Sequence, residues 1–133
     1  MRNNIMKNLF HFIAITAIVL GICSCNTKIE NPSARNLIGT WDLQRTEIIS
    51  PDGTVTSSQP KTLDYLVITE NSISFYDSDK LSKEARFAVK DNVIYVDGVA
   101  SYDIDNLTRK EMTLSVDGFG LLVSSYKYYY KKR

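Results

Sequence analysis

The residues best suited to acid–base or metal chemistry are confined to the first part of the chain. His11 is the only histidine, and Cys23 and Cys25 are the only cysteines. Everything after Cys25 therefore lacks the imidazole of a general base and the thiols of a disulfide or a zinc site. Ser124 and Ser125 have no histidine partner, and no phosphate loop or cofactor fingerprint is present. We expect a protein that is not an enzyme and binds no cofactor.

Paired carboxylates are the other groups that could do chemistry. Asp77-Ser78-Asp79 and Asp103-Ile104-Asp105 each place two carboxylates two residues apart, as the start of a calcium loop does. The third ligand position falls on Leu81 or Leu107, and both segments lack the glycine that the loop needs. We expect solvated carboxylates and no metal site. A hydrolase built on two acidic side chains stays open, because a fold can bring any two together.

A tyrosine-rich segment with basic residues ends the sequence, at residues 126–133. Such a pattern could stack sugars or bases. The net charge is +1, and without residues 1–24, which contain Arg2 and Lys7, it is −1, with 14 basic against 15 acidic residues. This near-neutral balance gives no general attraction for nucleic acid, so we expect no nucleic-acid partner. A strand with two faces explains the segment more simply. It places Tyr126, Tyr128 and Tyr130 on one face and Tyr129, Lys127 and Lys131 on the other.

Residues 1–24 have the three-part order of a secretory signal peptide. Arg2 and Lys7 precede an apolar run, residues 9–22, which small residues and a cysteine follow. The run is short for a membrane span, which needs roughly 20 apolar residues. We therefore expect residues 1–24 to be cleaved, and an uncleaved anchor helix is the alternative.

The end of this segment, Ile22-Cys23-Ser24-Cys25, resembles the lipobox of bacterial lipoproteins. That motif has a branched apolar residue three positions before the modified cysteine and a small residue immediately before it. Ile22 and Ser24 meet both demands for Cys25, whereas Cys23 follows a bulky residue. The resemblance implies a diacylglycerol and an N-acyl chain on Cys25, and two or three chains give stable membrane anchoring.

Residues 25–36 are expected to form the lipidated cysteine and a flexible tether. The segment is polar, contains Pro32 and has no helix or strand periodicity. The residue after Cys25 is Asn26 rather than aspartate, which argues against retention in the inner membrane by the rule known for enteric bacteria. We expect a lipid-anchored protein of the cell envelope, in the outer membrane.

Residues 37–133 are expected to form one small all-β domain. Alternating stretches rich in β-branched and aromatic residues predict about seven to nine strands. Turn sequences separate them, at Ser50–Gly53, Glu70-Asn71, Lys90–Asn92, Asp97-Gly98 and Asp117-Gly118. We expect Asn71 to take the left-handed conformation. The expected strands are 37–49, 63–69, 72–76, 85–89, 93–96, 111–116 and 121–131, with a short segment around 100–104.

Hairpin connections at this spacing favour a small antiparallel up-and-down β-barrel, since closure removes exposed edges. The start of the first strand, Ile38-Gly39-Thr40-Trp41, resembles the Gly-x-Trp signature of lipocalins. It is most similar to the short lipocalin-like domains of Bacteroidetes lipoproteins, in which the signature follows a lipobox and a brief tether. The resemblance implies that Gly39 and Trp41 are structural, with Trp41 across the closed end of the barrel. A basic residue of the last strand would cover Trp41, with candidates Lys127, Lys131 and Arg133.

Two functions from different classes follow from a barrel of this kind. One is a non-catalytic binding module that holds a small apolar or amphipathic ligand in its mouth. The other is a protein–protein or inhibitor-type module with a filled barrel, whose partner is an envelope protein. The candidate ligand-binding residues are the large apolar side chains of the middle strands, namely Tyr65, Phe75, Phe87, Tyr95 and Met112.

Overall fold

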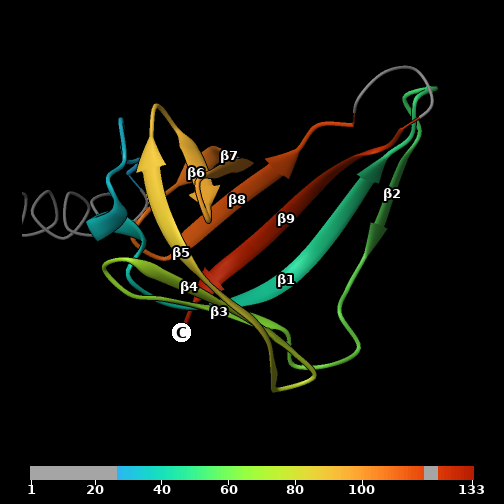
Figure 1. The fold of residues 1–133 in the computed structure, drawn as a ribbon. Helices are drawn as coiled ribbons and strands as arrows, with labels where there is room; N and C mark the ends of the chain where they lie inside the picture. The colour runs from blue at the N-terminus through green and yellow to red at the C-terminus, as the bar shows by residue number, and fades with distance from the viewer. Residues whose placement is uncertain (1–26, 119–122) are drawn as a thin grey trace, which may run out of the picture.

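The computed structural model describes residues 27–118 and 123–133, which form an antiparallel β-barrel (Figure 1). A short 3-10 helix, η2 (Ala34–Leu37), precedes the sheet. None of the helices in these ranges is long and apolar enough to cross a membrane. The strands are β1 (Gly39–Ile49), β2 (Val55–Ser58), β3 (Tyr65–Ile68), β4 (Ser72–Asp77), β5 (Lys80–Lys90), β6 (Val93–Val96), β7 (Val99–Leu107), β8 (Glu111–Val116) and β9 (Ser125–Lys132).

Strand β1 closes the barrel because it pairs on both of its edges. Its first part, Gly39–Asp42, pairs with β3, and almost its whole length pairs with β9 along the other edge. From β3 to β8, each strand pairs with the strand that follows it in the sequence, so the expected up-and-down barrel is confirmed. The extra strand β2 pairs only with the second part of β1, Thr46–Ile49.

Three of the hairpins turn through two residues that both have positive φ, as type I′ turns require. They are Ser78-Asp79, Asp91-Asn92 and Asp97-Gly98. The last two were expected from the sequence, and the first was not. The loop Glu70-Asn71 joins β3 and β4 as expected, but Asn71 does not have positive φ, so that part of the prediction was wrong. The backbone N–H of Thr69 donates to the carbonyl of Ser72 (3.0 Å) and closes this loop.

Two strand segments escaped the sequence analysis because neither has a buried face. Strand β5 begins at Lys80, before the expected start at Ala85, and its residues from Lys80 to Glu84 are all exposed. All residues of β2 are exposed as well. Alternation of apolar and polar residues predicts a strand only where one face is buried, so these segments carried no pattern.

The core fills one half of the barrel. Inward-facing residues of neighbouring strands meet there, such as Leu66 of β3 opposite Phe75 of β4 and Ile73 of β4 opposite Ala85 of β5. The buried cluster consists of Leu37, Trp41, Leu66, Ile68, Ile73, Ala85, Phe87, Ile94, Val96, Ile104, Leu107, Met112 and Leu114.

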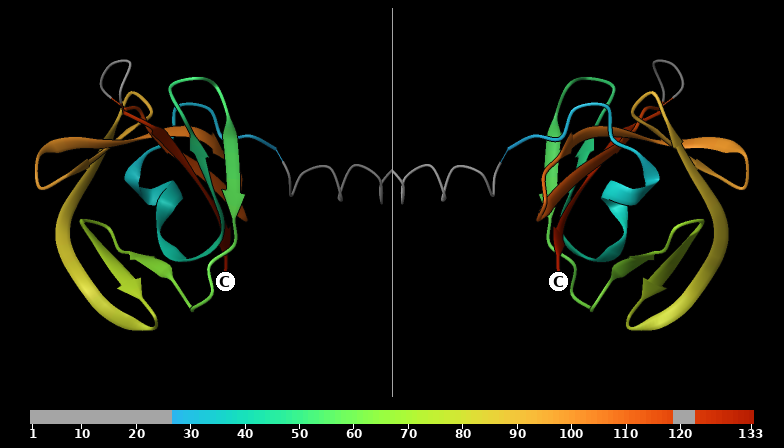
Figure 2. Two further views of the ribbon diagram at one scale, coloured as in Figure 1. Left: turned by 90° about the vertical axis from the view of Figure 1, so that its right-hand side faces the viewer. Right: turned by 90° about the vertical axis from the view of Figure 1, so that its left-hand side faces the viewer.

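Trp41 and η2 close that end of the barrel. The Trp41 side chain is fully buried, and its indole N–H donates to the carbonyl of Leu37 (2.8 Å) at the end of η2. Views along the barrel show η2 lying across the opening (Figure 2). The preceding residues also pack here: the N–H of Ile29 donates to the carbonyl of Leu107 (2.7 Å), and Pro32 is buried. Three residues of the segment expected to be a flexible tether, Ile29, Pro32 and Ala34, therefore lie against the barrel.

The basic residue over Trp41 is Lys132, not one of the three candidates named from the resemblance. Lys132 lies opposite Trp41 in the β1–β9 register, and its ammonium is 5.4 Å from the ring centroid. Gly39 has φ +143°, and a Cβ there would lie 2.5 Å from the Cε of Lys132. Gly39 thus leaves room for the lysine stem that crosses Trp41. The three candidates lie elsewhere: Lys127 pairs with Asp105, Arg133 pairs with Asp42, and Lys131 is exposed.

Candidate functional site at the barrel mouth

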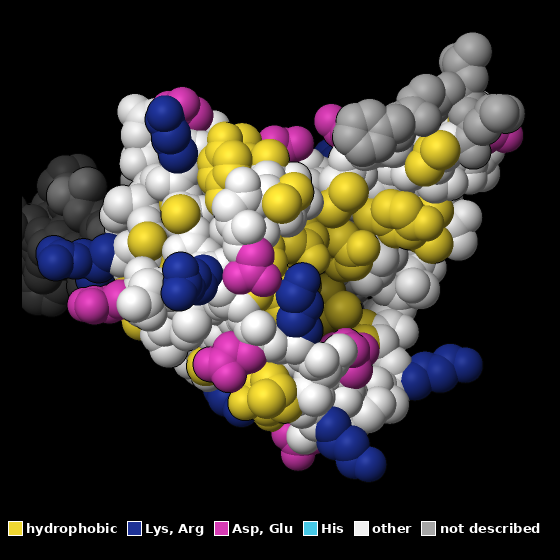
Figure 3. Space-filling view, viewed as in Figure 1, with side chains coloured by type: hydrophobic (Ala, Val, Ile, Leu, Met, Phe, Trp, Pro, Cys, Tyr) yellow, Lys and Arg dark blue, Asp and Glu magenta, His cyan; other side chains and the backbone are white. Residues whose placement is uncertain are grey.

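The end of the barrel opposite η2 is open. Strand β1 runs beyond β3 there, with β2 alongside its second part and β9 along its other edge (Figure 1). The inner face of this long ribbon is not fully covered, so side chains such as Tyr126 and Tyr128 are only partly buried. Figure 3 shows hydrophobic side chains gathered in a hollowed area at this place. The mouth is therefore where the interior of the barrel meets solvent.

A hollow of about 180 Å³ lies in the mouth. Its floor is the upper surface of the core, because Leu66 belongs to both. Its lining comes from β1, β3, β4, β7 and β9 and consists of Leu43, Asp64, Tyr65, Leu66, Phe75, Tyr76, Asp77, Tyr102, Tyr128 and Tyr130. A second hollow of about 280 Å³ shares Phe75, Asp77 and Tyr102 with the first, and Lys83 lies on its wall.

Aromatic rings from three strands line the mouth in a continuous row. The ring centroids of Phe75 and Tyr102 are 6.4 Å apart, and those of Tyr102 and Tyr128 are 6.2 Å apart in an edge-to-face arrangement. Tyr128 stacks in turn with Tyr126, at 6.4 Å. Such contacts stabilise the rings in fixed orientations. The row therefore offers a rigid aromatic wall rather than a flexible one.

The tyrosine hydroxyls of the mouth are neutral and available to a ligand. Burial raises the pKa of Tyr102, Tyr128 and most strongly Tyr130. The reason is that the charged phenolate needs water more than the neutral phenol does, so a buried tyrosine resists losing its proton. In the described part of the chain, the tyrosines whose hydroxyls form hydrogen bonds are Tyr65, with Asp79, and Tyr129, with Glu47. The hydroxyls of Tyr102, Tyr128 and Tyr130 have no such bond to a described residue, so they can donate or accept.

The structure brings one of the five candidate ligand-binding residues into the mouth with its ring exposed to the hollow. This residue is Phe75. Phe87 and Met112 lie deep in the core, with 6% and 1% of their surface exposed. Tyr65 and Tyr95 belong to the outer face of their strands. Each is next in sequence to a buried residue that faces inward, Leu66 or Ile94.

Tyr65 reaches the rim of the hollow, but its ring is held outside the barrel. It stacks on Tyr76 with centroids 4.5 Å apart, and its hydroxyl donates to Asp79 (2.7 Å). That hydrogen bond to a carboxylate raises the pKa of Tyr65. The guanidinium of Arg133 lies 4.7 Å from the ring centroid. These contacts give Tyr65 a structural role on the outer surface.

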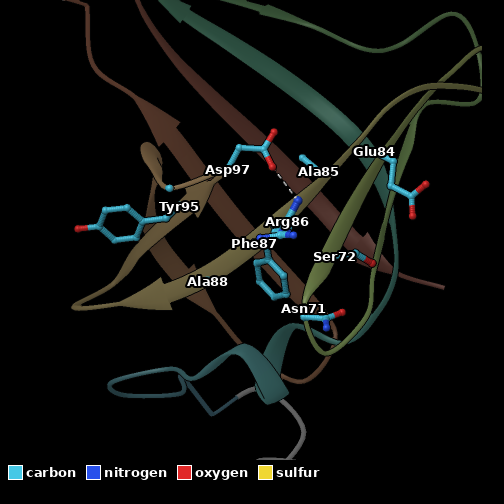
Figure 4. Close-up of a pocket in the computed structure, with 10 residues that line it drawn as sticks. Asn71, Ser72, Glu84, Ala85, Arg86, Phe87, Ala88, Tyr95 and Asp97 are labelled. Atoms are coloured by element: carbon cyan, nitrogen blue, oxygen red, sulfur yellow. Dashed lines mark hydrogen bonds between the residues drawn. The ribbon is translucent and has the colours of Figure 1, made fainter.

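A larger hollow, of about 740 Å³, lies against β5 and β6 on the outside of the barrel (Figure 4). The N–H of Arg86 donates to the Asp97 carboxylate (2.9 Å) at its centre. Figure 4 shows the side chains of Tyr95 and Glu84 pointing away from each other. A binding site needs polar groups that converge on one ligand, and this surface lacks that arrangement. We therefore assign the candidate site to the mouth.

Sequence reasoning missed most of the residues that line the mouth. It placed Tyr128 and Tyr130 correctly on one face of the last strand, but it treated them as barrel wall. Tyr102 lay in a segment of uncertain type, and Asp64 and Asp77 were regarded as ordinary strand-end or loop residues. The signal that could have found Tyr128 and Tyr130 is the register between the last two strands. In that register Tyr128 lies opposite Leu114 and Tyr130 lies opposite Met112.

No group of three or more metal-binding side chains comes together within residues 27–118 and 123–133. Asp79 and Asp105 of the two acidic segments bind the hydroxyls of Tyr65 and Ser115. The signal peptide and the lipid attachment on Cys25 lie outside the described residues. Comparisons with protein-family models, with curated proteins and with solved structures found no match to this chain.

Proposed function

We propose that this protein is a binding module that holds a small amphipathic molecule in the mouth of its barrel. The observation that carries the proposal is an aromatic-lined hollow that opens above a filled core, where the hydroxyls of Tyr102, Tyr128 and Tyr130 have no hydrogen-bond partner among the described residues. Ligand sites combine apolar walls with a few polar groups that fix orientation. The wall of Phe75, Tyr102 and Tyr128 provides the first, and the hydroxyls of the tyrosines provide the second.

The size of the mouth limits the ligand. Ligand pockets commonly span about 300–1,000 Å³, and the hollows that meet at Phe75 and Tyr102 are about 180 and 280 Å³. The filled half of the barrel leaves no deep calyx, since Trp41, Met112 and Leu107 occupy it. The ligand is therefore a small molecule that inserts one end and leaves the other at the rim.

Binding can be measured with a soluble form that begins at residue 26. Every strand pairing and the whole core lie after that point, so this form retains the interactions that fold the barrel. We expect saturable binding of the uncharged fluorescent probe N-phenyl-1-naphthylamine. Tyr128→Ala should weaken it about tenfold, because loss of an aromatic contact of about 1.4 kcal/mol corresponds to that factor.

Tyr129→Ala is the matched control for this experiment. Tyr129 lies on the same strand but faces outward, where its hydroxyl donates to Glu47 (3.0 Å) and Arg45 covers its ring. This variant should bind the probe as the parent protein does. Tyr102→Leu provides a second test of the mouth if Tyr128→Ala unfolds, as judged by circular dichroism. The proposal would be contradicted if Tyr128→Ala and Tyr129→Ala lost probe affinity equally, or if the folded parent protein showed no saturable binding. Either result would favour the partner-binding module.

We further infer that the protein is a lipocalin-like lipoprotein of the cell envelope, anchored through Cys25 with its mouth turned away from the membrane. The hydrogen bond from Ile29 to Leu107 fixes the chain to the closed end only four residues after Cys25. Four extended residues span at most ~14 Å, so the anchor would hold the closed end near the bilayer. Basic side chains gather at this end, and they favour anionic headgroups. They are Arg109, Lys110, Lys131, Lys132 and Arg133.

Metabolic labelling with a palmitate analogue tests the anchor. Cys25→Ala should abolish the label, since it removes the thiol that accepts the diacylglycerol. Cys23→Ala is the matched control and should keep the label, because Cys23 does not follow a small residue. Label retained in Cys25→Ala would refute the assignment.

A further inference from the structure

The charged groups that line the first hollow of the mouth all have one sign. They are the carboxylates of Asp64 and Asp77, and no lysine, arginine or histidine is among the described residues of this lining. The two acids come from different elements: Asp64 immediately precedes β3, and Asp77 ends β4. Their meeting at one rim is a product of the fold, because thirteen positions separate them along the chain.

Asp64 is held in place by its neighbours. Its Oδ1 accepts a hydrogen bond from the hydroxyl of Thr62 (2.8 Å) and another from the backbone N–H of Ser78 (2.9 Å). These bonds tie the entry of β3 to the turn that follows β4. The carboxylate is therefore oriented before any ligand arrives.

Asp77 is not neutralised by the lysines near it. Lys80 lies opposite Asp77 across the β4–β5 hairpin, and Lys83 lies on the wall of the second hollow. The salt bridges in the described part of the chain are Arg45–Glu47, Lys127–Asp105 and Arg133–Asp42. Neither lysine is thus within ion-pair distance of Asp77, and the negative charge at the rim stays available.

The aromatic wall has the same electrostatic preference as the carboxylates. The face of a tyrosine or phenylalanine ring carries negative potential and attracts cations. Four rings, those of Phe75, Tyr102, Tyr128 and Tyr130, line the hollow beside the acids. The Tyr130 hydroxyl has no hydrogen-bond partner among the described residues. It could accept a hydrogen bond from an N–H group.

We propose that the molecule held in the mouth is an amphipathic amine, with an ammonium group between Asp64, Asp77 and the aromatic faces and an apolar body along the wall. This inference rests on the proposed binding function and adds the chemical class of the ligand. An anionic amphiphile such as a fatty acid would instead place its carboxylate beside two carboxylates. Like charges at short range repel each other, so such a ligand is disfavoured.

Three compounds share the same apolar body and differ in the charge of their end group. They are 4-phenylbutylamine, 4-phenylbutanol and 4-phenylbutyrate. Each is titrated against the N-phenyl-1-naphthylamine complex at pH 7, where the amine is protonated. We expect the amine to bind at least about tenfold more tightly than the butyrate, with the alcohol in between. Raising the salt concentration should weaken the amine only.

Two variants test the assigned carboxylates. Asp64→Asn and Asp77→Asn should each lower the preference for the amine over the alcohol about fivefold or more, since they keep the side-chain volume and remove the charge. Glu84→Gln is the matched control. Glu84 is an exposed acid of β5 that faces the outer hollow, so its loss should change neither compound.

The outcomes distinguish this inference from the function on which it rests. Equal displacement by all three compounds, or tighter binding of the butyrate, would overturn the amine assignment and leave the binding module intact. An amine preference that Asp64→Asn and Asp77→Asn do not alter would overturn it as well. If the probe itself does not bind, the proposed function fails and the inference fails with it.

Discussion

Replacement of Trp41 by alanine is expected to lower the free energy of unfolding by about 3–5 kcal/mol. Trp41 is fully buried at the closed end, where it packs under η2 and Lys132 covers its ring. Alanine would leave a void that the surrounding strands cannot fill, because their positions are fixed by the β1–β3 and β1–β9 ladders. Urea denaturation of the form beginning at residue 26, followed by circular dichroism, measures the change.

Two further variants separate the causes of this loss. Trp41→Phe keeps most of the ring volume but removes the indole N–H, so the Leu37 carbonyl loses its partner; a cost of about 1–3 kcal/mol is expected. Tyr95→Ala removes a large ring from the outer face of β6 and should cost much less than Trp41→Ala. If the two alanine variants lose similar stability, the closed end does not depend on Trp41 and its assignment is wrong.

The fold was largely predictable because its signals are local. Asp91-Asn92 and Asp97-Gly98 supply residues that tolerate positive φ between apolar stretches, and each forms the expected hairpin. Ser78-Asp79 forms the same turn, but the first part of β5 after it, Lys80–Glu84, is exposed on both faces, so neither the turn nor this part of the strand was expected. Barrel closure joins β1 to β9, the first and last strands. It could be expected only from the general disadvantage of open edges.

The candidate site was harder to predict because period-two alternation identifies two faces without saying which is inside. In β3 and β6 both faces are apolar, so Tyr65 and Tyr95 were as plausible inside as Leu66 and Ile94. The burial of Leu66 and Ile94 depends on the strands across the barrel. The bulge in β4–β5 after Phe75 adds a further shift that no local pattern encodes. The polar rim of the mouth follows from these long-range pairings.

Stability is expected to fall as the pH rises above about 10, the ordinary pKa of tyrosine. Burial raises the pKa of Tyr130 well above that value, and the nearby Tyr102 and Tyr128 rings and the carboxylates of Asp64 and Asp77 add to the effect. Above pH 10 the unfolded chain releases the Tyr130 proton while the folded protein keeps it. The folded state then binds more protons, so the free energy of unfolding decreases with pH.

The expected slope is about 1.4 kcal/mol per pH unit for Tyr130, and solvent screening makes the contribution of Tyr128 smaller. Urea denaturation between pH 8 and pH 11.5 measures it. Tyr130→Phe keeps the ring in the mouth but removes the ionisable hydroxyl, so its stability should fall less steeply over this range. If the stability of Tyr130→Phe falls as steeply as that of the parent, Tyr130 is not the group whose burial opposes ionisation.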